Sequence, residues 1–230
     1  EAISHAIDRE AIVNSFFEGR AEVAKNPFQP TGLGYDNDNE PYVFDQEKAR
    51  QLLEESSYNG VEIELWAMPI PRPYMPDGAK VAEVIQKNLE DIGLKTKIVT
   101  FEWATYLEKT SNGDAQLFLL GGTSDNGDPD NLLSLFFDKN GSLNNSQLDD
   151  ADVQAWLKAA RETTVEAERV ELYKKIQERL REVIPVLPLV HATPILGVKE
   201  GVKGYIPHPT ESDDLSKVTV ESYDGKDNFP

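Results

Sequence analysis

The sequence predicts an α/β fold, because strand-like and helix-like stretches alternate along much of its 230 residues. Residues 61–66 alternate apolar and polar side chains, as a half-buried strand does, and residues 81–92 carry apolar side chains at helical spacing. A second strand is predicted over 94–101 and a third, almost wholly apolar, over 116–120. This β-α-β order predicts a sheet whose strands are joined through helices.

Composition and charge exclude several classes of protein. The 41 acidic and 23 basic residues give a net charge of −18, which disfavours binding to nucleic acid or to an anionic membrane surface. The absence of cysteine removes thiolate metal sites, cysteine nucleophiles and disulfides. No apolar run is long enough to span a bilayer.

The N-terminal part is predicted to be helical and then turn-rich. Apolar side chains at helical spacing predict one helix over residues 3–17, ended by Gly19. The glycine-, proline- and asparagine-rich stretch 27–41 predicts an ordered loop, and Asp45 is expected to cap the next helix. Because the chain begins inside a helical pattern, without an initiator methionine, we expect it to be cut from a longer protein.

Two predicted loops follow strands and are therefore candidates for ligand binding. Residues 68–76 contain four prolines and predict a stiff loop after the first strand. The third strand opens into the polar, glycine-containing stretch 121–130. In α/β sheets, ligands bind at loops that follow the carboxyl ends of strands.

The remainder predicts helices and then short extended pieces. Helices are expected at 132–136, 153–161 and 166–183, and a proline-interrupted edge or crossover strand at 186–190. Residues 195–230 contain short strand-like pieces without an evident core. We expect them to pack on a part of the protein that this chain does not contain.

Motifs for catalysis, metals and cofactors are absent from the sequence. There is no nucleophile elbow, phosphate-binding loop, zinc-protease motif or dinucleotide fingerprint, and the three histidines lack ligand-type spacing. We therefore expect no catalytic residues, no metal and no cofactor. A carboxylate-dependent hydrolase using Asp125 and Asp128 stays open as an alternative.

Several strings resemble one protein family, the bacterial extracellular solute-binding proteins of family 5. Those shared with the family as a whole are AISHAIDREAI at 2–12, YVFDQEKA at 42–49 and RVELY at 169–173. Those most similar to its dipeptide-binding branch are LWAMP at 65–69, RPY at 72–74, VTFEW at 99–103, DNGDPDN at 125–131 and VKGY at 202–205. The resemblance runs from end to end of the chain.

The resemblance implies a class II periplasmic-binding-protein-like lobe, with a mixed sheet flanked by helices. Residues 1–194 would form the second, C-terminal lobe, and residues 195–230 would return to a first lobe that is mostly absent. The implied function is the extracytoplasmic substrate-binding subunit of an ABC importer, not an enzyme. It would be a monomer, in the periplasm or as a cell-surface lipoprotein, that captures dipeptides or short peptides and delivers them to the permease.

The same resemblance implies which residues bind the ligand. Asp125 would take the peptide ammonium and Arg72 the peptide carboxylate, with Tyr74, Gly122 and Thr123 beside them. A guanidinium can bind a carboxylate through two hydrogen bonds, and Arg72 has a proline on each side that restricts it. Gly122 stands where the dipeptide-binding branch usually has tryptophan, which removes an aromatic wall next to Asp125.

Two further alternatives remain from the sequence. Members of the family also carry oligopeptides, nickel complexes, haem or sugars, so the solute can differ from a dipeptide. The chain can also be a lobe that serves as an interaction domain, in which case neither Arg72 nor Asp125 would matter for anything but local stability.

Overall fold

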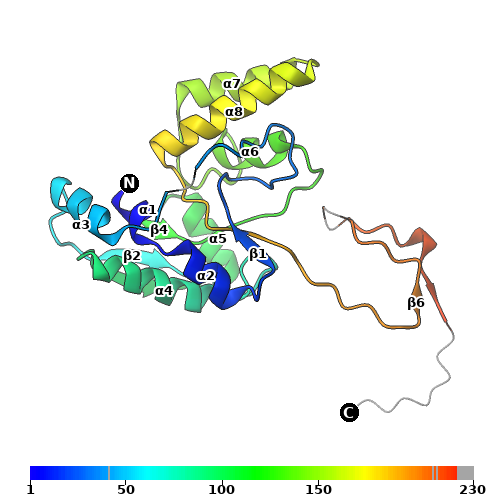
Figure 1. The fold of residues 1–230 in the computed structure, drawn as a ribbon, viewed down its shortest axis with the longest axis horizontal. Helices are drawn as coiled ribbons and strands as arrows, with labels where there is room; N and C mark the ends of the chain where they lie inside the picture. Colours follow the sequence, from blue (N-terminus) through cyan, green and yellow to red (C-terminus); the bar gives the residue numbers. More distant parts are fainter. Residues whose placement is uncertain (41, 209, 211, 222–230) are drawn as a thin grey trace, which may run out of the picture.

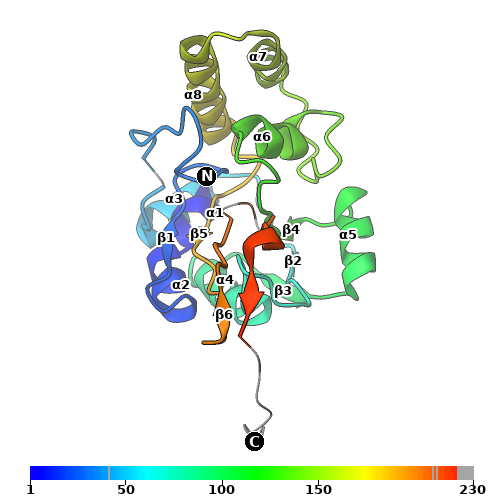
Figure 2. The ribbon, with the colours of Figure 1, turned by 90° about the vertical axis from the view of Figure 1, so that its right-hand side faces the viewer.

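The computed structural model contains a three-stranded parallel sheet with the order β3-β2-β4 (Figures 1 and 2). The strands are β2 (Ile63–Trp66), β3 (Thr96–Val99) and β4 (Leu117–Phe118). Helix α4 (Gly78–Asp91) joins β2 to β3, and α5 (Trp103–Ser111) joins β3 to β4. The structure describes residues 1–40, 42–208, 210 and 212–221.

Helix α4 forms as its sequence predicts. The Asp77 side chain caps it by accepting a hydrogen bond from the backbone N–H of Lys80. Its apolar residues Val81, Ile85 and Leu89 are buried in the cluster that also contains the sheet residues. The chain then leaves the helix at Gly93, whose φ of +91° is a left-handed conformation that glycine adopts without strain.

The N-terminal helix is broken in two, and the prediction of one continuous helix over 3–17 was wrong. Helix α1 (Ala2–Ala6) ends at Ile7, which is extended, and α2 (Arg9–Phe16) begins one residue after Asp8. The Asp8 side chain accepts a hydrogen bond from the N–H of Ala11 and so caps a new helix. Both helices keep their apolar residues in the core. The spacing of apolar residues along the sequence therefore does not reveal the break.

A separate two-stranded antiparallel sheet joins distant parts of the chain. Strand β1 (Ala21–Val23), which the sequence analysis missed, pairs with β5 (Val190–Ala192). The predicted strand over 186–190 overlaps β5 only at Val190, because Pro188 has no N–H to donate to a ladder. Helix α3 (Gln46–Glu55) is capped by Asp45, as predicted.

Three helices form a second layer beside the sheet (Figure 2). They are α6 (Pro129–Phe137), α7 (Ala151–Glu162) and α8 (Glu166–Val183). Helix α6 begins earlier than the predicted 132–136, because the Asp128 side chain caps it and proline is well suited to the first helical turn. Their buried residues form a second apolar cluster around Phe28, Phe137, Leu157 and Ile176, distinct from the cluster under the sheet.

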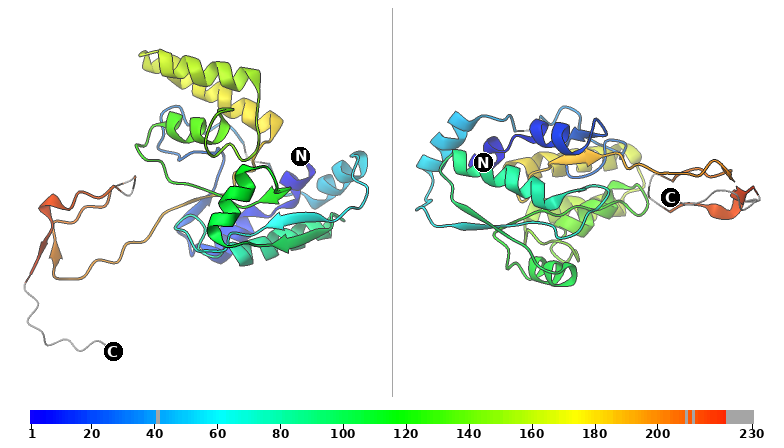
Figure 3. Two further views of the ribbon diagram at one scale, coloured as in Figure 1. Left: turned by 180° about the vertical axis from the view of Figure 1, so that it is seen from behind. Right: turned by 90° about the horizontal axis from the view of Figure 1, so that it is seen from below.

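The described residues after Pro194 form a C-terminal arm that runs away from both clusters (Figures 1 and 3). Strands β6 (Val202–Lys203) and β7 (Thr219–Val220) pair with each other, and η1 (Leu215–Lys217) precedes β7. The large apolar residues that are exposed here are Ile195, Leu196, Val198, Ile206, Leu215 and Val220. Residues 209, 211 and 222–230 of the predicted returning segment lie outside the described residues, and the boundary at 194/195 stays a prediction.

The predicted α/β fold class is confirmed. The parallel and the antiparallel strand pairs lie in separate small sheets. Within the described ranges, no helix combines the length and apolar character needed to cross a membrane.

Candidate functional site

The two candidate loops leave neighbouring strands at the same edge of the sheet. Strands β2 and β4 are parallel and adjacent, with Trp66 opposite Phe118. The loop with Arg72 follows β2 and the loop with Asp125 follows β4, so both start at the carboxyl edge. Sequence alone predicts the two strands but not that they are neighbours.

The two loops touch each other through Tyr74 and Gly121. A Cβ added to Gly121 would lie 2.7 Å from Cδ2 of Tyr74, so the tyrosine ring packs directly against the glycine backbone. Only a residue without a side chain permits this approach. The contact sets the loop after β2 against the loop after β4.

A groove of about 2320 Å³ opens beside the two loops. Tyr74, Gly122 and Thr123 are among the residues that line it, whereas Arg72 and Asp125 are not. The other walls come from the loop at 26–31, from residues 183–196 and from parts of the C-terminal arm. The structure therefore brings three of the five predicted residues to the groove and leaves the two charged ones at its margin.

Arg72 is held by its backbone and by an aromatic ring. Its N–H and C=O exchange hydrogen bonds with Met75, at 3.0 and 2.9 Å, which closes a tight turn. The carbon at the centre of its guanidinium lies 4.8 Å from the ring centroid of Trp103, the first residue of α5. Its Nε is buried and has no hydrogen-bond partner in the described part of the chain.

Asp125 is exposed and held by hydrogen bonds to Asn131 of α6. Its backbone N–H donates to Oδ1 of Asn131 at 3.0 Å, and Nδ2 of Asn131 donates to Oδ2 of Asp125 at 3.3 Å. The Ser124 hydroxyl donates to the same Oδ1 at 3.3 Å and accepts from the N–H of Gly127 at 2.9 Å. These bonds fix the loop while part of the Asp125 carboxylate remains accessible.

Gly122 and Thr123 precede Asp125 in the loop after β4, and both are exposed. A Cβ added to Gly122 would lie 3.4 Å from Cζ of Phe136. The backbone at Gly122 thus leaves the edge of the Phe136 ring uncovered toward the groove, which both residues line. A larger side chain would cover it.

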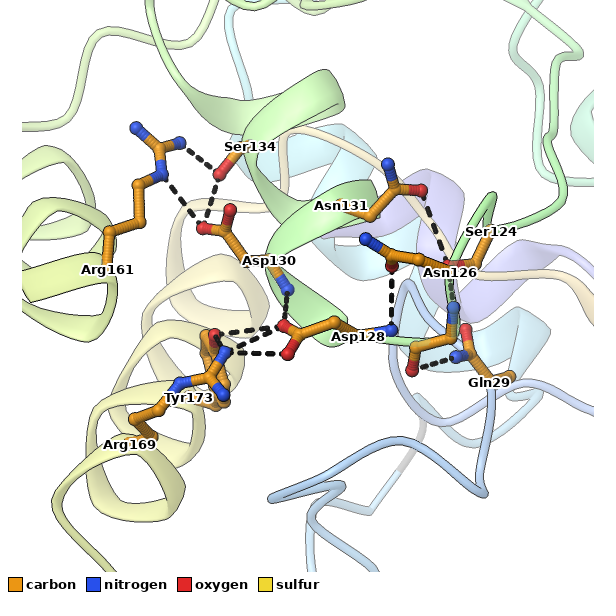
Figure 4. Close-up of polar contacts among 11 residues, drawn as sticks. Gln29, Ser124, Asn126, Asp128, Asp130, Asn131, Ser134, Arg161, Arg169 and Tyr173 are labelled. Atoms are coloured by element: carbon orange, nitrogen blue, oxygen red, sulfur yellow. Dashed lines mark hydrogen bonds and ion pairs between the residues drawn. The ribbon is translucent and has the colours of Figure 1, made fainter. Parts of the chain in front are cut away.

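Asp128 and Asp130 are tied to arginines of the helical layer (Figure 4). Asp128 accepts hydrogen bonds from Arg169 at 2.8 Å, and Asp130 accepts one from Arg161 at 2.9 Å. Burial opposes ionisation of Asp128, but the hydrogen bonds from Arg169 and from the N–H of Asp130 prevail and lower the pKa of its carboxyl. A carboxyl held ionised in this way is poorly suited to act as the general acid of a hydrolase.

The sequence analysis missed residues that support the two loops. Tyr106 is fully buried, and its hydroxyl lies 3.1 Å from the carbonyl oxygen of Trp66 and 2.7 Å from that of Leu119, at the ends of β2 and β4. Its ring stacks on Trp103, with centroids 5.8 Å apart and planes at 13°. The helical spacing of Trp103 and Tyr106 is visible in the sequence, but their position under the loops is not.

A comparison with protein-family models matches residues 1–144 to the bacterial extracellular solute-binding proteins, family 5, middle region. This match covers more than half of the chain. The chain belongs to this family. The family predicted from the sequence is thereby confirmed.

Relatives within family 5 bind different solutes, according to their names. The dipeptide-binding protein of Escherichia coli (strain K12) is 37% identical over 225 residues, which are 96% of this chain and 42% of that protein. Heme-binding protein A of Haemophilus influenzae (strain ATCC 51907 / DSM 11121 / KW20 / Rd) is 35% identical over 224 residues, 96% and 41% of the two chains.

Similarity to a solved structure confirms the class II periplasmic-binding-protein fold that the sequence predicts. The dipeptide-binding protein from Pseudoalteromonas sp. SM9913, in complex with Met-Leu, superposes with a TM-score of 0.87 at 28% identity. The match covers 96% of this chain and 44% of that one. This family 5 chain therefore spans less than half the length of the curated relatives and the solved structure that it matches.

Proposed function

We propose that the protein is the extracytoplasmic substrate-binding subunit of an ABC importer, and that it captures dipeptides or short peptides. The observation that carries this proposal is the meeting of two loops at the carboxyl edge of β2 and β4. One loop bears Arg72, which has no ion-pair partner among the described residues, and the other bears the exposed Asp125. The two charges have the signs that a zwitterionic ligand requires.

The chemistry of a dipeptide fits this arrangement. Taking its ammonium and carboxylate out of water costs several kcal/mol for each charge unless each finds a partner. Asp125 takes the ammonium, and Arg72 takes the carboxylate through a two-pronged hydrogen bond. Tyr74, Gly122 and Thr123 line the groove for the part of the ligand between its ends. A fixed distance between the two charges would select ligands by length.

Capture requires a second lobe. The chain spans about 42% of the length of the Escherichia coli relative, and the exposed apolar residues of the C-terminal arm are suited to packing on the remaining part. In this proposal residues 1–194 form one lobe and residues 195–230 return to the other. Closure of the two lobes around the ligand, and not chemistry, is the functional step, so the protein is not an enzyme.

The same role with another solute is a second candidate. One relative at 35% identity is named heme-binding protein A, and Gly122 leaves the edge of the Phe136 ring uncovered toward the groove, where a large apolar ligand would contact it. With a peptide or with another solute, the protein works outside the cytoplasm, in the periplasm or as a cell-surface lipoprotein. It acts as a monomer and delivers its ligand to the permease.

Calorimetric titration of the full-length protein with Ala-Ala tests the proposal. We expect micromolar or tighter binding that is strongly weakened, but still measurable, with N-acetyl-Ala-Ala and in the Asp125→Ala and Arg72→Ala variants. Binding of haem, followed by its absorbance, without binding of any dipeptide would replace the dipeptide by the second candidate. Turnover of a dipeptide would contradict a binding function.

A further inference from the structure

Arg72 is the last member of a stack that begins at the sheet. The Tyr106 hydroxyl is bound at the ends of β2 and β4, and its ring stacks on Trp103. The guanidinium of Arg72 lies on Trp103 at 4.8 Å. Two aromatic rings, those of Trp103 and Tyr106, thus connect the guanidinium to the strands that support both loops. This connection adds to the one through its own loop.

Trp103 has a fixed position because helix α5 is capped at its start. The Glu102 side chain accepts hydrogen bonds from the N–H groups of Ala104 at 2.9 Å and Thr105 at 3.3 Å. Trp103 is the first residue of the helix, between the capping residue Glu102 and Ala104. The capped backbone and the stacking on the buried Tyr106 together restrict the ring.

A comparison with Arg9 separates a structural arginine from Arg72. The Arg9 guanidinium is buried and donates to the carbonyl oxygens of Ala24, Pro188 and Tyr42. Its donors are satisfied by loops that it ties together. The Arg72 guanidinium has a ring against its face instead, and no side-chain hydrogen bond or ion pair is recorded for it within the described residues.

Stacking uses the face of a guanidinium and leaves the donors at its edge unused. In Arg72 the Nε is buried, so the two terminal nitrogens are the donors that can bind an anion. It also restricts a long side chain before the ligand arrives, which reduces the entropy lost on binding. We propose that Trp103 is a positioning residue, which holds Arg72 ready for the carboxylate of the ligand. This inference rests on the proposed function.

The test compares ligands with and without a carboxylate in the full-length protein. Ala-Ala and its C-terminal amide are titrated against wild type, Trp103→Leu, Trp103→Phe and Arg72→Ala. We expect Trp103→Leu to weaken Ala-Ala binding by about three- to thirtyfold, from the range of cation–π energies, and to leave amide binding nearly unchanged. Trp103→Phe should restore part of the loss, because a smaller ring remains.

Two controls separate positioning from general damage. Phe101→Leu removes another ring that carries a cation, Lys109 at 5.4 Å, and should not distinguish the two ligands. In the Arg72→Ala background, Trp103→Leu should cause no further loss of Ala-Ala affinity, because the residue it positions is absent.

Three outcomes overturn the inference. Unchanged Ala-Ala binding by Trp103→Leu would mean that the ring does not position Arg72, and tighter binding would mean that it holds Arg72 away from the ligand. An equal loss for Ala-Ala and its amide would mean a structural role only. If wild type binds neither ligand, the proposed function itself fails. The wild-type titrations therefore distinguish failure of the function from failure of the inference.

Discussion

The two loops at the carboxyl edge of the sheet hold their charges by different means. The loop after β2 is stiffened by prolines and a backbone turn, and its Arg72 rests on an aromatic ring. The loop after β4 is held by side-chain hydrogen bonds through Asn131 and by the ion pair of Asp128 with Arg169. One loop depends on packing and the other on polar contacts.

This difference follows from the chemistry of the two charges. A guanidinium is planar and weakly hydrated, so an aromatic face can hold it without using its donors. A carboxylate has only acceptors, so it is held by N–H groups, here from Asn131. The loop of Asp125 should therefore respond to pH through its ion pair, and the loop of Arg72 to changes in ring packing.

The largest expected effect is at Tyr106, which contacts the strands below both loops. Tyr106→Ala should lower the free energy of unfolding by about 3–5 kcal/mol, because it removes a buried ring and leaves a cavity. Tyr106→Phe should lower the free energy of unfolding by about 1–2 kcal/mol, since the buried carbonyl oxygen of Leu119 loses its hydroxyl partner. Urea unfolding followed by circular dichroism measures both. A loss below about 1 kcal/mol for Tyr106→Ala would contradict the anchoring role.

An intermediate effect is expected at Asn131, on the Asp125 side alone. Asn131→Ala should weaken Ala-Ala binding by about tenfold, because the Asp125 carboxylate and its backbone N–H lose the same partner. Binding of N-acetyl-Ala-Ala, which lacks the ammonium, should not weaken further. Calorimetry on the full-length protein measures both ligands, with the exposed Asn140→Ala as control. Equal losses of affinity for the two ligands would mean that Asn131 does not act through the site for the ammonium. The contrast with Trp103, which is expected to act through the site for the carboxylate, would then fail.

The smallest expected effect is the pH dependence of the Asp128–Arg169 pair. Although burial opposes it, hydrogen bonding to Arg169 and to the N–H of Asp130 lowers the pKa of Asp128 below the unfolded value of about 3.9. The resulting stability is therefore complete above about pH 5 and is lost as the pH falls through the lowered pKa of the folded protein.

Asp128→Asn should accordingly destabilise the protein at pH 7, by about 0.5–1 kcal/mol because the pair is partly exposed to solvent. Near pH 3 the difference from wild type should shrink. Thermal unfolding at both pH values measures it, and the exposed Asp149→Asn serves as the control. A difference that grows on acidification would contradict the assignment of the pair.

Sequence patterns identified most of the individual elements correctly. The cap at Asp45, the apolar stripe of α4 and the span of α8 depend on contacts within a few residues of one another, so they can be read locally. The break at Asp8 was missed because the apolar spacing continues across it, and β1 was missed because three residues carry too little periodicity.

By itself, the sequence determined the α/β class, the loops that follow the strands, and the family through its strings of matching residues. Tertiary structure decided that β2 and β4 are neighbours, that Tyr74 packs on Gly121, and that Tyr106 and Trp103 lie beneath Arg72. The physical reason is the range of the contacts. Periodicity and capping act over one or two helical turns, whereas strand order and side-chain stacking depend on residues that only the folded chain brings together.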